Sequence, residues 1–102
     1  DTFVLTNLGA DRDTVMDFDA TDGFEVSATA FGGGLTVGTL AASQFVASTS
    51  ALATDADDRF LYDTDNGYLW FDADGNGAGA RTLIAIVTGA PTLDASYFTV
   101  VI

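Results

Sequence analysis

The chain has 102 residues, a length typical of one domain, and 48% of them are hydrophobic against 18% that are charged. That balance excludes a disordered acidic tail, and no apolar run reaches the roughly 18 residues that a membrane-spanning helix needs. Three arginines, no lysine and no histidine stand against fifteen acids, for a formal net charge of −12. A chain of this charge repels phosphate and anionic lipid, so neither nucleic acid nor membrane insertion is expected.

The first half of the chain contains short runs of β-branched and aromatic residues separated by turn residues, which predict strands. The strands expected here are 2–6, 13–19 and 24–27. The segment 35–53 is rich in Thr, Ser and Ala, and we expect a loop there with at most one helical turn near 39–45. Asp1 opens the chain without a Met, a basic segment or an apolar core before the first strand, which is typical of a piece of a longer protein.

The second half has a clearer pattern. Asn66-Gly67 between the aromatic runs 59–63 and 68–72 predicts a β-hairpin. The run 81–88 is apolar on both faces, so it is expected to be a central strand. The last run, 96–102, is expected to be an exposed terminal strand that could pair with a neighbouring copy. The predicted fold class is therefore all-β with little helix.

The residue types argue against an enzyme. Histidine, cysteine and lysine, which serve most often as general bases and nucleophiles, are absent. A pair of aspartates of the kind used in glycoside hydrolysis remains conceivable, but the aspartates stand in turn-like settings, and nothing in the sequence marks an apolar pocket around them. We expect a non-catalytic protein.

Calcium binding accounts for the acidic residues better than catalysis does. Fourteen of them are Asp and only one is Glu. Asp is favoured in turns and in loops that bind calcium. The stretch Asp72-x-Asp74-x-Asn76-Gly77 matches the opening of an EF-hand loop, but its twelfth position is Leu83 and not Glu, which excludes a true EF-hand. A calcium loop of another kind and a simple hairpin turn remain as alternatives.

A second group of aspartates lies near the N-terminus. Strand alternation places Asp13, Asp17 and Asp19 along one side of the run 13–19. These carboxylates would repel one another unless a cation or wide solvation separated them, and Arg12 is the only nearby positive charge. This group also favours calcium.

The same aspartates carry a resemblance to a known family. Asp1-Thr2-Phe3-Val4 resembles the end of the glycine–aspartate nonapeptide G-G-x-G-x-D-x-U-x, with Asp1 at the D position and Phe3 at the apolar position. DTVMDF at 13–18 and DGFEVSA at 22–28 resemble the segments that follow such repeats in haemolysin-type (RTX) calcium-binding proteins. The part from Arg59 to Ile102 is similar to their C-terminal segment and, more distantly, to the tail of serralysin-type proteases.

The resemblance implies an architecture and a function. Residues 1–34 would flank a parallel β-roll that holds calcium between its turns, 35–58 would be a loop-rich linker, and 59–102 would form an antiparallel, sandwich-like cap. Family members leave the cell through type I secretion by an uncleaved C-terminal signal and fold on extracellular calcium, and the absence of Cys agrees with such export. The chain departs from the family pattern at Phe24, which replaces an Ile, and it lacks the complete glycine-rich repeats.

Taken together, the resemblance and the residue patterns imply a secreted, calcium-binding domain whose partners are the upstream β-roll repeats and the type I secretion machinery. The candidate calcium ligands are Asp1, Asp13, Asp17, Asp22, Asp72, Asp74 and Asn76.

An alternative function is an extracellular adhesion or surface-assembly module that binds a polysaccharide or a neighbouring protein through calcium and exposed aromatic rings. The hairpin aromatics that would stack on sugars are Phe60, Tyr62, Tyr68 and Trp70. The competing interpretation is that these rings form the hydrophobic core.

Overall fold

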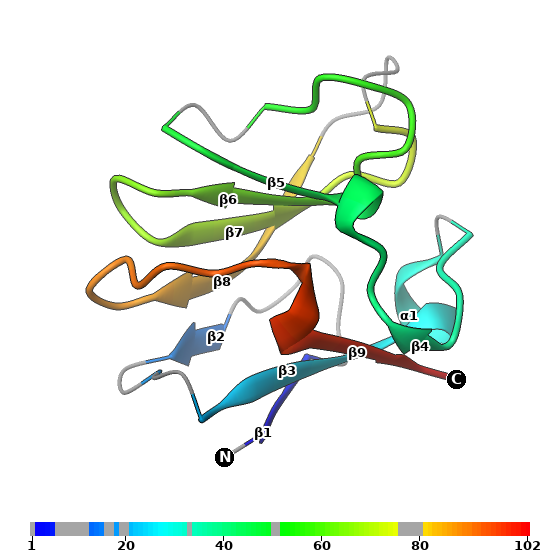
Figure 1. Ribbon diagram of the computed structural model, residues 1–102, viewed down its shortest axis with the longest axis horizontal. Helices are drawn as coiled ribbons and strands as arrows, with labels where there is room; N and C mark the ends of the chain where they lie inside the picture. The colour runs from blue at the N-terminus through cyan, green and yellow to red at the C-terminus, as the bar shows by residue number, and fades with distance from the viewer. Residues whose placement is uncertain are drawn as a thin grey trace.

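The computed structural model describes residues 2–5, 13–15, 18, 21–32, 34–49, 52–75 and 81–102, and for Thr2 and 13–15 it describes the backbone alone. The described strands form two mixed sheets that share one hydrophobic core (Figure 1). The first sheet has the order β1 (Thr2–Leu5), β3 (Gly23–Ser27), β9 (Phe98–Val101), β4 (Gly38–Thr39). The second has the order β2 (Asp13–Val15), β8 (Thr82–Val87), β7 (Tyr68–Phe71), β6 (Phe60–Asp63), β5 (Phe45–Ser48). The all-β fold class is thereby confirmed.

Helical structure in the described residues is limited to single turns. They are α1 (Ala28–Phe31), η1 (Ala42–Gln44) and η2 (Ala95–Tyr97). Ser27 caps α1 by accepting a hydrogen bond from the backbone N–H of Ala30, at 3.1 Å. Within the described part of the chain, no helix has the length and apolar character required to cross a membrane.

The first three strands alternate between the two sheets. The chain passes from β1 in the first sheet to β2 in the second and returns to the first as β3. β3 runs parallel to β1 with Gly23 opposite Thr2, so one circuit advances the chain by 21 residues. β1 and β2 are the outermost strands of their sheets, and both lie in the lower part of Figure 1, towards the N-terminus. This path is one turn of a two-sheet coil.

The hairpin and the central strand follow the sequence predictions. β6 and β7 pair antiparallel, and Asp63 Oδ1 closes their turn by accepting a hydrogen bond from the N–H of Asp65, at 2.8 Å. Gly67 has a φ of +75°, and a Cβ atom there would clash with the carbonyl oxygen of Val87, so the turn requires glycine. β8 lies between β2 and β7, which confirms its central position.

Two expectations about the sheets are wrong. The terminal strand is not an exposed edge, because β9 lies between β3 and β4. The segment predicted to be a loop contains the strands β4 and β5, because its residues pair with β9 and β6, whereas the single turn η1 lies where a helical turn was expected. Within 59–102 the pairs β6–β7 and β7–β8 are antiparallel, as expected, whereas β5–β6, β2–β8 and β3–β9 are parallel.

Aromatic rings in mutual contact form the centre of the core. In the first sheet, the ring centroids of Phe98 and Phe24 lie 5.0 Å apart. The Phe98 centroid also lies 5.3 Å from that of Phe60, which belongs to the second sheet. Phe71 continues the contact at 5.1 Å from Phe60. Such ring pairs contribute about 0.5–1.5 kcal/mol each beyond the burial of their area. The two sheets are therefore held together by rings that alternate with outward-facing residues along short strands.

Tyr62 is the polar member of this core. Its ring is fully buried, and its hydroxyl donates a hydrogen bond to the carbonyl oxygen of Pro91, at 2.6 Å. Burial, followed by the negative charge of Asp63, raises the pKa of Tyr62 from 10.0 to about 12. The neutral phenol therefore links β6 to the segment that precedes β9.

We expect stability to fall steeply at alkaline pH because of Tyr62. Its folded-state pKa is the higher one, so its favourable contribution is complete below pH 10.0 and is lost as the pH rises towards about 12. The loss amounts to about 2–3 kcal/mol of unfolding free energy. Urea unfolding between these pH values measures it. Tyr62→Phe should flatten the fall and cost about 1 kcal/mol at neutral pH. An equally steep fall in Tyr62→Phe would contradict the assignment, and Tyr68→Phe is the control.

Candidate functional site

The aspartates predicted near the N-terminus belong to the coil. Asp13 begins β2, where its backbone lies opposite Ala85 of β8. Asp22 immediately precedes β3 and is half-buried. Because Thr2 and Gly23 are register partners, Asp1 and Asp22 stand directly before equivalent positions of two parallel strands. Asp1 itself lies outside the described residues, as do Asp17 and Asn76.

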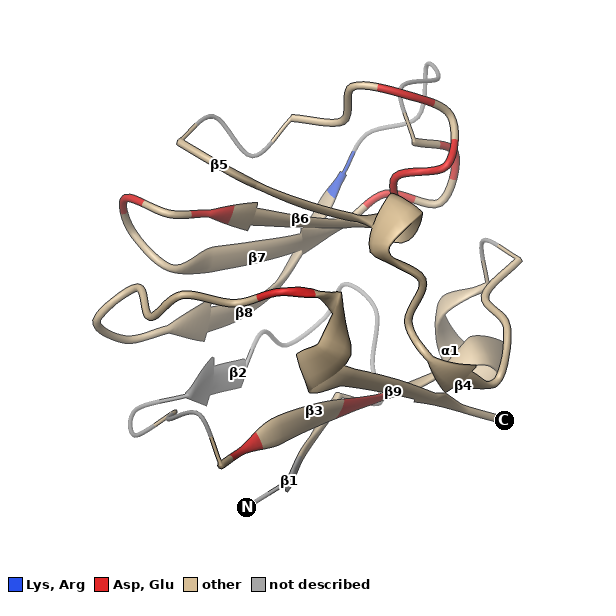
Figure 2. Ribbon diagram, in the orientation of Figure 1, with Lys and Arg blue, Asp and Glu red and all other residues tan. Residues whose placement is uncertain are grey.

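Asp72 and Asp74 lie in a different place, in the turn that follows β7. This turn, 72–75, packs against the loop 54–59, and we call the two together the acidic loop pair. Figure 2 shows its acidic residues gathered at the upper right, away from the start of β3. Gly75 has a φ of +63°, and a Cβ atom there would lie 2.6 Å from the carbonyl oxygens of both Asp55 and Ala56. The close packing of the loops therefore depends on glycine at this position.

Asp58 organises the first loop, a role that the sequence analysis missed. Its side chain is only 3% exposed. Its Oδ2 accepts hydrogen bonds from the backbone N–H groups of Thr54 and Asp55, at 2.8 and 3.1 Å, and from the Thr54 hydroxyl at 3.2 Å. The sequence signal that could have revealed it is the cluster of Thr and Asp before a strand, which is typical of side chains that close turns.

Asp72 is the buried acid of the second loop, with 6% of its surface exposed. Its backbone N–H donates to the carbonyl oxygen of Arg59, at 2.8 Å, and its Oδ1 accepts from the N–H of Asp74, at 3.2 Å. Burial raises the pKa of Asp72, and the nearby Asp74 carboxyl adds to the shift. Because the pKa is higher in the folded chain, ionisation of Asp72 at neutral pH opposes folding.

Arg59 supplies the opposite charge within the acidic loop pair. Its guanidinium Nη1 donates hydrogen bonds to the carbonyl oxygens of Ala56 and Asp58, at 2.7 and 2.9 Å. Its positive charge also lowers the pKa of Asp72 and so offsets part of the effect of burial. The side chain thus places a cation among carbonyl and carboxylate oxygens, the same kind of oxygen atoms that calcium prefers.

The structure brings Asp72 and Asp74 together but does not complete a metal site. Among the residues that the structure describes, no group of three acidic side chains is arranged to hold a metal ion. The choice between a calcium loop and a plain turn for 72–76 therefore depends in part on Asn76, which lies outside that description.

The aromatic residues of the hairpin are divided between two environments. Phe60 and Tyr62 are fully buried in the core, as the core interpretation predicts. Tyr68 and Trp70 are half-exposed, because they alternate along β7 with the buried Leu69 and Phe71. The Arg81 guanidinium carbon lies 4.0 Å from the centre of the Trp70 ring, in a cation–π contact that covers one face of the indole.

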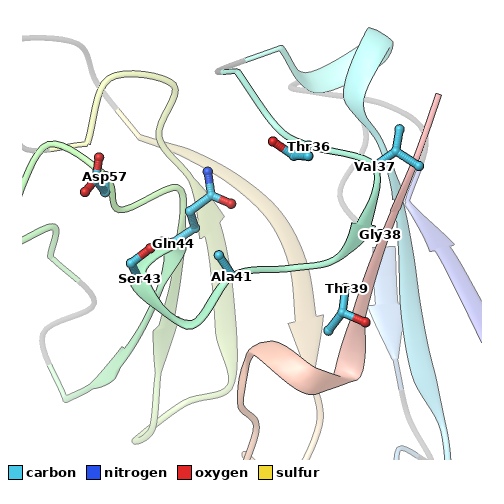
Figure 3. A pocket seen from close by; sticks show the side chains of 8 residues that line it. All are labelled: Thr36, Val37, Gly38, Thr39, Ala41, Ser43, Gln44 and Asp57. Carbon is cyan, nitrogen blue, oxygen red and sulfur yellow. The ribbon is translucent and has the colours of Figure 1, made fainter.

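A polar hollow lies between the strand β4 and the single turn η1 (Figure 3). Its volume is about 470 Å³, and polar side chains from 36–44 and from Asp57 line it. Sequence reasoning missed this feature because the walls come from a segment predicted to be a loop, and because Asp57 joins them only through tertiary packing.

Comparison with known proteins found no match for this chain among family models, curated proteins or solved structures. Inferences about its function therefore rest on the residues and their geometry.

We expect Arg59 and Asp72 to be energetically coupled. Arg59→Gln should lower the unfolding free energy by about 1–3 kcal/mol, because it weakens two hydrogen bonds from a charged donor and removes the cation beside a buried carboxylate. Asp72→Asn retains an acceptor for the Asp74 N–H and should recover part of this loss in the double variant.

A double-mutant cycle by urea unfolding at neutral pH measures the coupling. Arg81→Gln is the matched control, since it removes a cation from Trp70 instead. Additive effects of Arg59→Gln and Asp72→Asn would contradict this account of the acidic loop pair.

Proposed function

We propose that this chain is a non-catalytic, calcium-associated end cap of a parallel β-roll in a secreted protein. The observation that carries the proposal is the path of β1, β2 and β3, which alternates between the two sheets and returns in parallel register. A β-roll is built by repeating this circuit. The chain would then supply the final turn of the roll, together with the strands that close its end.

The two ends of the sheets support a cap with one docking side. At the N-terminal end, β1 and β2 are both edge strands, and within the described residues no strand pairs with their outer sides. An added coil would extend both sheets at once by strand pairing. At the other end, β4 has only two residues, and the segment 40–44 crosses from the first sheet to the second. The short edge β4 limits further pairing of the first sheet, and the second sheet ends there in the four-residue β5.

The position of the aspartates supports the calcium part of the proposal. Aspartate stands at the beginning of all three strands of the coil: Asp1 precedes β1, Asp13 begins β2 and Asp22 precedes β3. Calcium between successive turns would draw on carboxylates repeated in this way, with Asp17 as a further ligand. Mutual repulsion of these acids at low calcium would keep the chain loose, and binding of the ion would contribute folding free energy outside the cell.

Calcium-induced folding of a fusion protein tests the cap. We expect an array of glycine–aspartate nonapeptides to fold at a calcium concentration at least about threefold lower when this chain follows it than when the array stands alone. Circular dichroism during a calcium titration gives the midpoints. The matched control places the same chain before the array, where the edges β1 and β2 do not meet its last coil.

Equal midpoints for the two orders would overturn the capping role. Asp22→Asn in the productive order should raise the calcium midpoint, whereas Asp65→Asn, at the tip of the β6–β7 hairpin, should leave it unchanged. If both variants match the unmodified fusion, calcium does not bind at the start of β3.

The proposal also assigns the type I secretion signal to the C-terminal half of the chain. We expect a passenger protein fused to residues 50–102 to leave bacteria that carry a type I exporter, as measured by the passenger activity in the medium. The same passenger fused to residues 1–49 is the control. Export of the control alone, or of neither fusion, would show that residues 50–102 do not contain the secretion signal.

A further inference from the structure

We propose that the polar hollow between β4 and η1 binds a neutral, polyhydroxylated ligand such as a terminal sugar residue. The hollow lies at the end of the sheets away from β1 and β2, so a cap docked through those strands would leave it exposed. The inference does not depend on calcium or on the capping role.

The chemistry of the walls selects the ligand. Thr36 and Ser43 contribute hydroxyls, Gln44 a carboxamide and Asp57 a carboxylate. This set offers both hydrogen-bond donors and acceptors, which is what sugar hydroxyls require. The described residues that line the hollow include no lysine, no arginine and no aromatic ring. With a net charge of −12 on the chain, an anionic ligand would be repelled.

The polar side chains are available to a ligand. Across the described part of the chain, no hydrogen bond engages the side-chain polar atoms of Thr36, Ser43, Gln44 or Asp57. Figure 3 shows Thr36 on one side of the hollow, with Ser43, Gln44 and Asp57 on the other. A ligand placed between them can therefore form new hydrogen bonds without breaking existing ones.

Backbone hydrogen bonds hold both walls in place before any ligand arrives. On one side, β4 pairs with β9, and the N–H of the buried Leu40 donates to the carbonyl oxygen of Phe98, at 3.0 Å. On the other side, the N–H of Gln44 donates to the carbonyl oxygen of Ala41, at 2.9 Å, and the carbonyl oxygen of Gln44 accepts from Arg59, at 3.0 Å. The entropy lost on binding is smaller for walls that are already ordered.

A sugar is favoured over a cationic ligand by the balance of groups. Asp57 is the single charged side chain among the described lining residues, and it lies on one side. An ammonium or guanidinium group has no acceptor, so it would leave the donor groups of Thr36, Ser43 and Gln44 without a partner. The exposed Val37 adds an apolar surface at the rim that suits the C–H face of a sugar ring.

NMR titration of the ¹⁵N-labelled chain with neutral monosaccharides tests the inference. Glucose, galactose, mannose and N-acetylglucosamine are added separately up to about 100 mM, because a ligand of this size is expected to bind with a Kd on the order of 1–20 mM. At least one sugar should shift the amide signals of 36–44 and Asp57. The shifts should be equal with calcium and with a chelator, which separates this test from that of the capping role.

Two variants and a matched control locate the binding. Gln44→Ala and Asp57→Ala should each weaken the sugar about fivefold to tenfold, the expected cost of one lost hydrogen bond. Asp65→Ala, which removes an exposed turn aspartate at the hairpin tip, should bind as the unmodified chain does. The thermal midpoint of each variant shows that it is folded.

Four results would overturn the inference. They are the absence of shifts with every sugar, shifts centred on Tyr68 and Trp70 instead of the hollow, unchanged affinity in both Gln44→Ala and Asp57→Ala, and tighter binding of arginine amide than of any sugar.

Discussion

The contact between Phe98 and Phe60 joins the two sheets, and the rest of the fold depends on it. Phe98 lies on β9, the strand that β3 and β4 flank in the first sheet, and Phe60 lies on β6 of the second. Phe24 extends the stack towards the coil, and Phe71 extends it through the second sheet. Strands of two to six residues offer few inward positions. Large rings at those positions bury the area that a small core needs.

The negative charge of the chain is concentrated in turns because the core has no room for it. Asp58 and Asp63 close turns by accepting backbone hydrogen bonds, so much of the acidity already has a structural role. Asp72 is different, since burial raises its pKa and its charge opposes folding. Arg59, one of only three cations in the chain, lies beside it. The acidic loop pair is therefore organised around the half-buried Arg59, whereas the aspartates of the coil repeat with the strands.

Strand pattern and turn chemistry accounted for much of the fold. The Asn66-Gly67 hairpin and the central β8 were predictable because their signals are local: a glycine-dependent turn, and a run that is apolar on both faces. β5 was missed because its two strong strand formers, Phe45 and Val46, stand in a segment rich in Thr, Ser and Ala, and because its partner β6 lies further along the chain. β9 was mistaken for an edge because its neighbours β3 and β4 come from far away along the chain.

The sequence by itself determined the all-β class, the acidic character and the aspartates at the start of the strands, since these follow from residue type and short spacing. Only the tertiary structure decided three other features. Asp72 is buried beside Arg59, and the Arg81 guanidinium lies over the Trp70 ring. Asp57 and Thr36 lie on opposite sides of a hollow. Each of these relations joins residues that lie more than ten positions apart. The first two depend on strand pairing within the second sheet, and the third depends on how the segments around β4 and η1 pack, neither of which local pattern encodes.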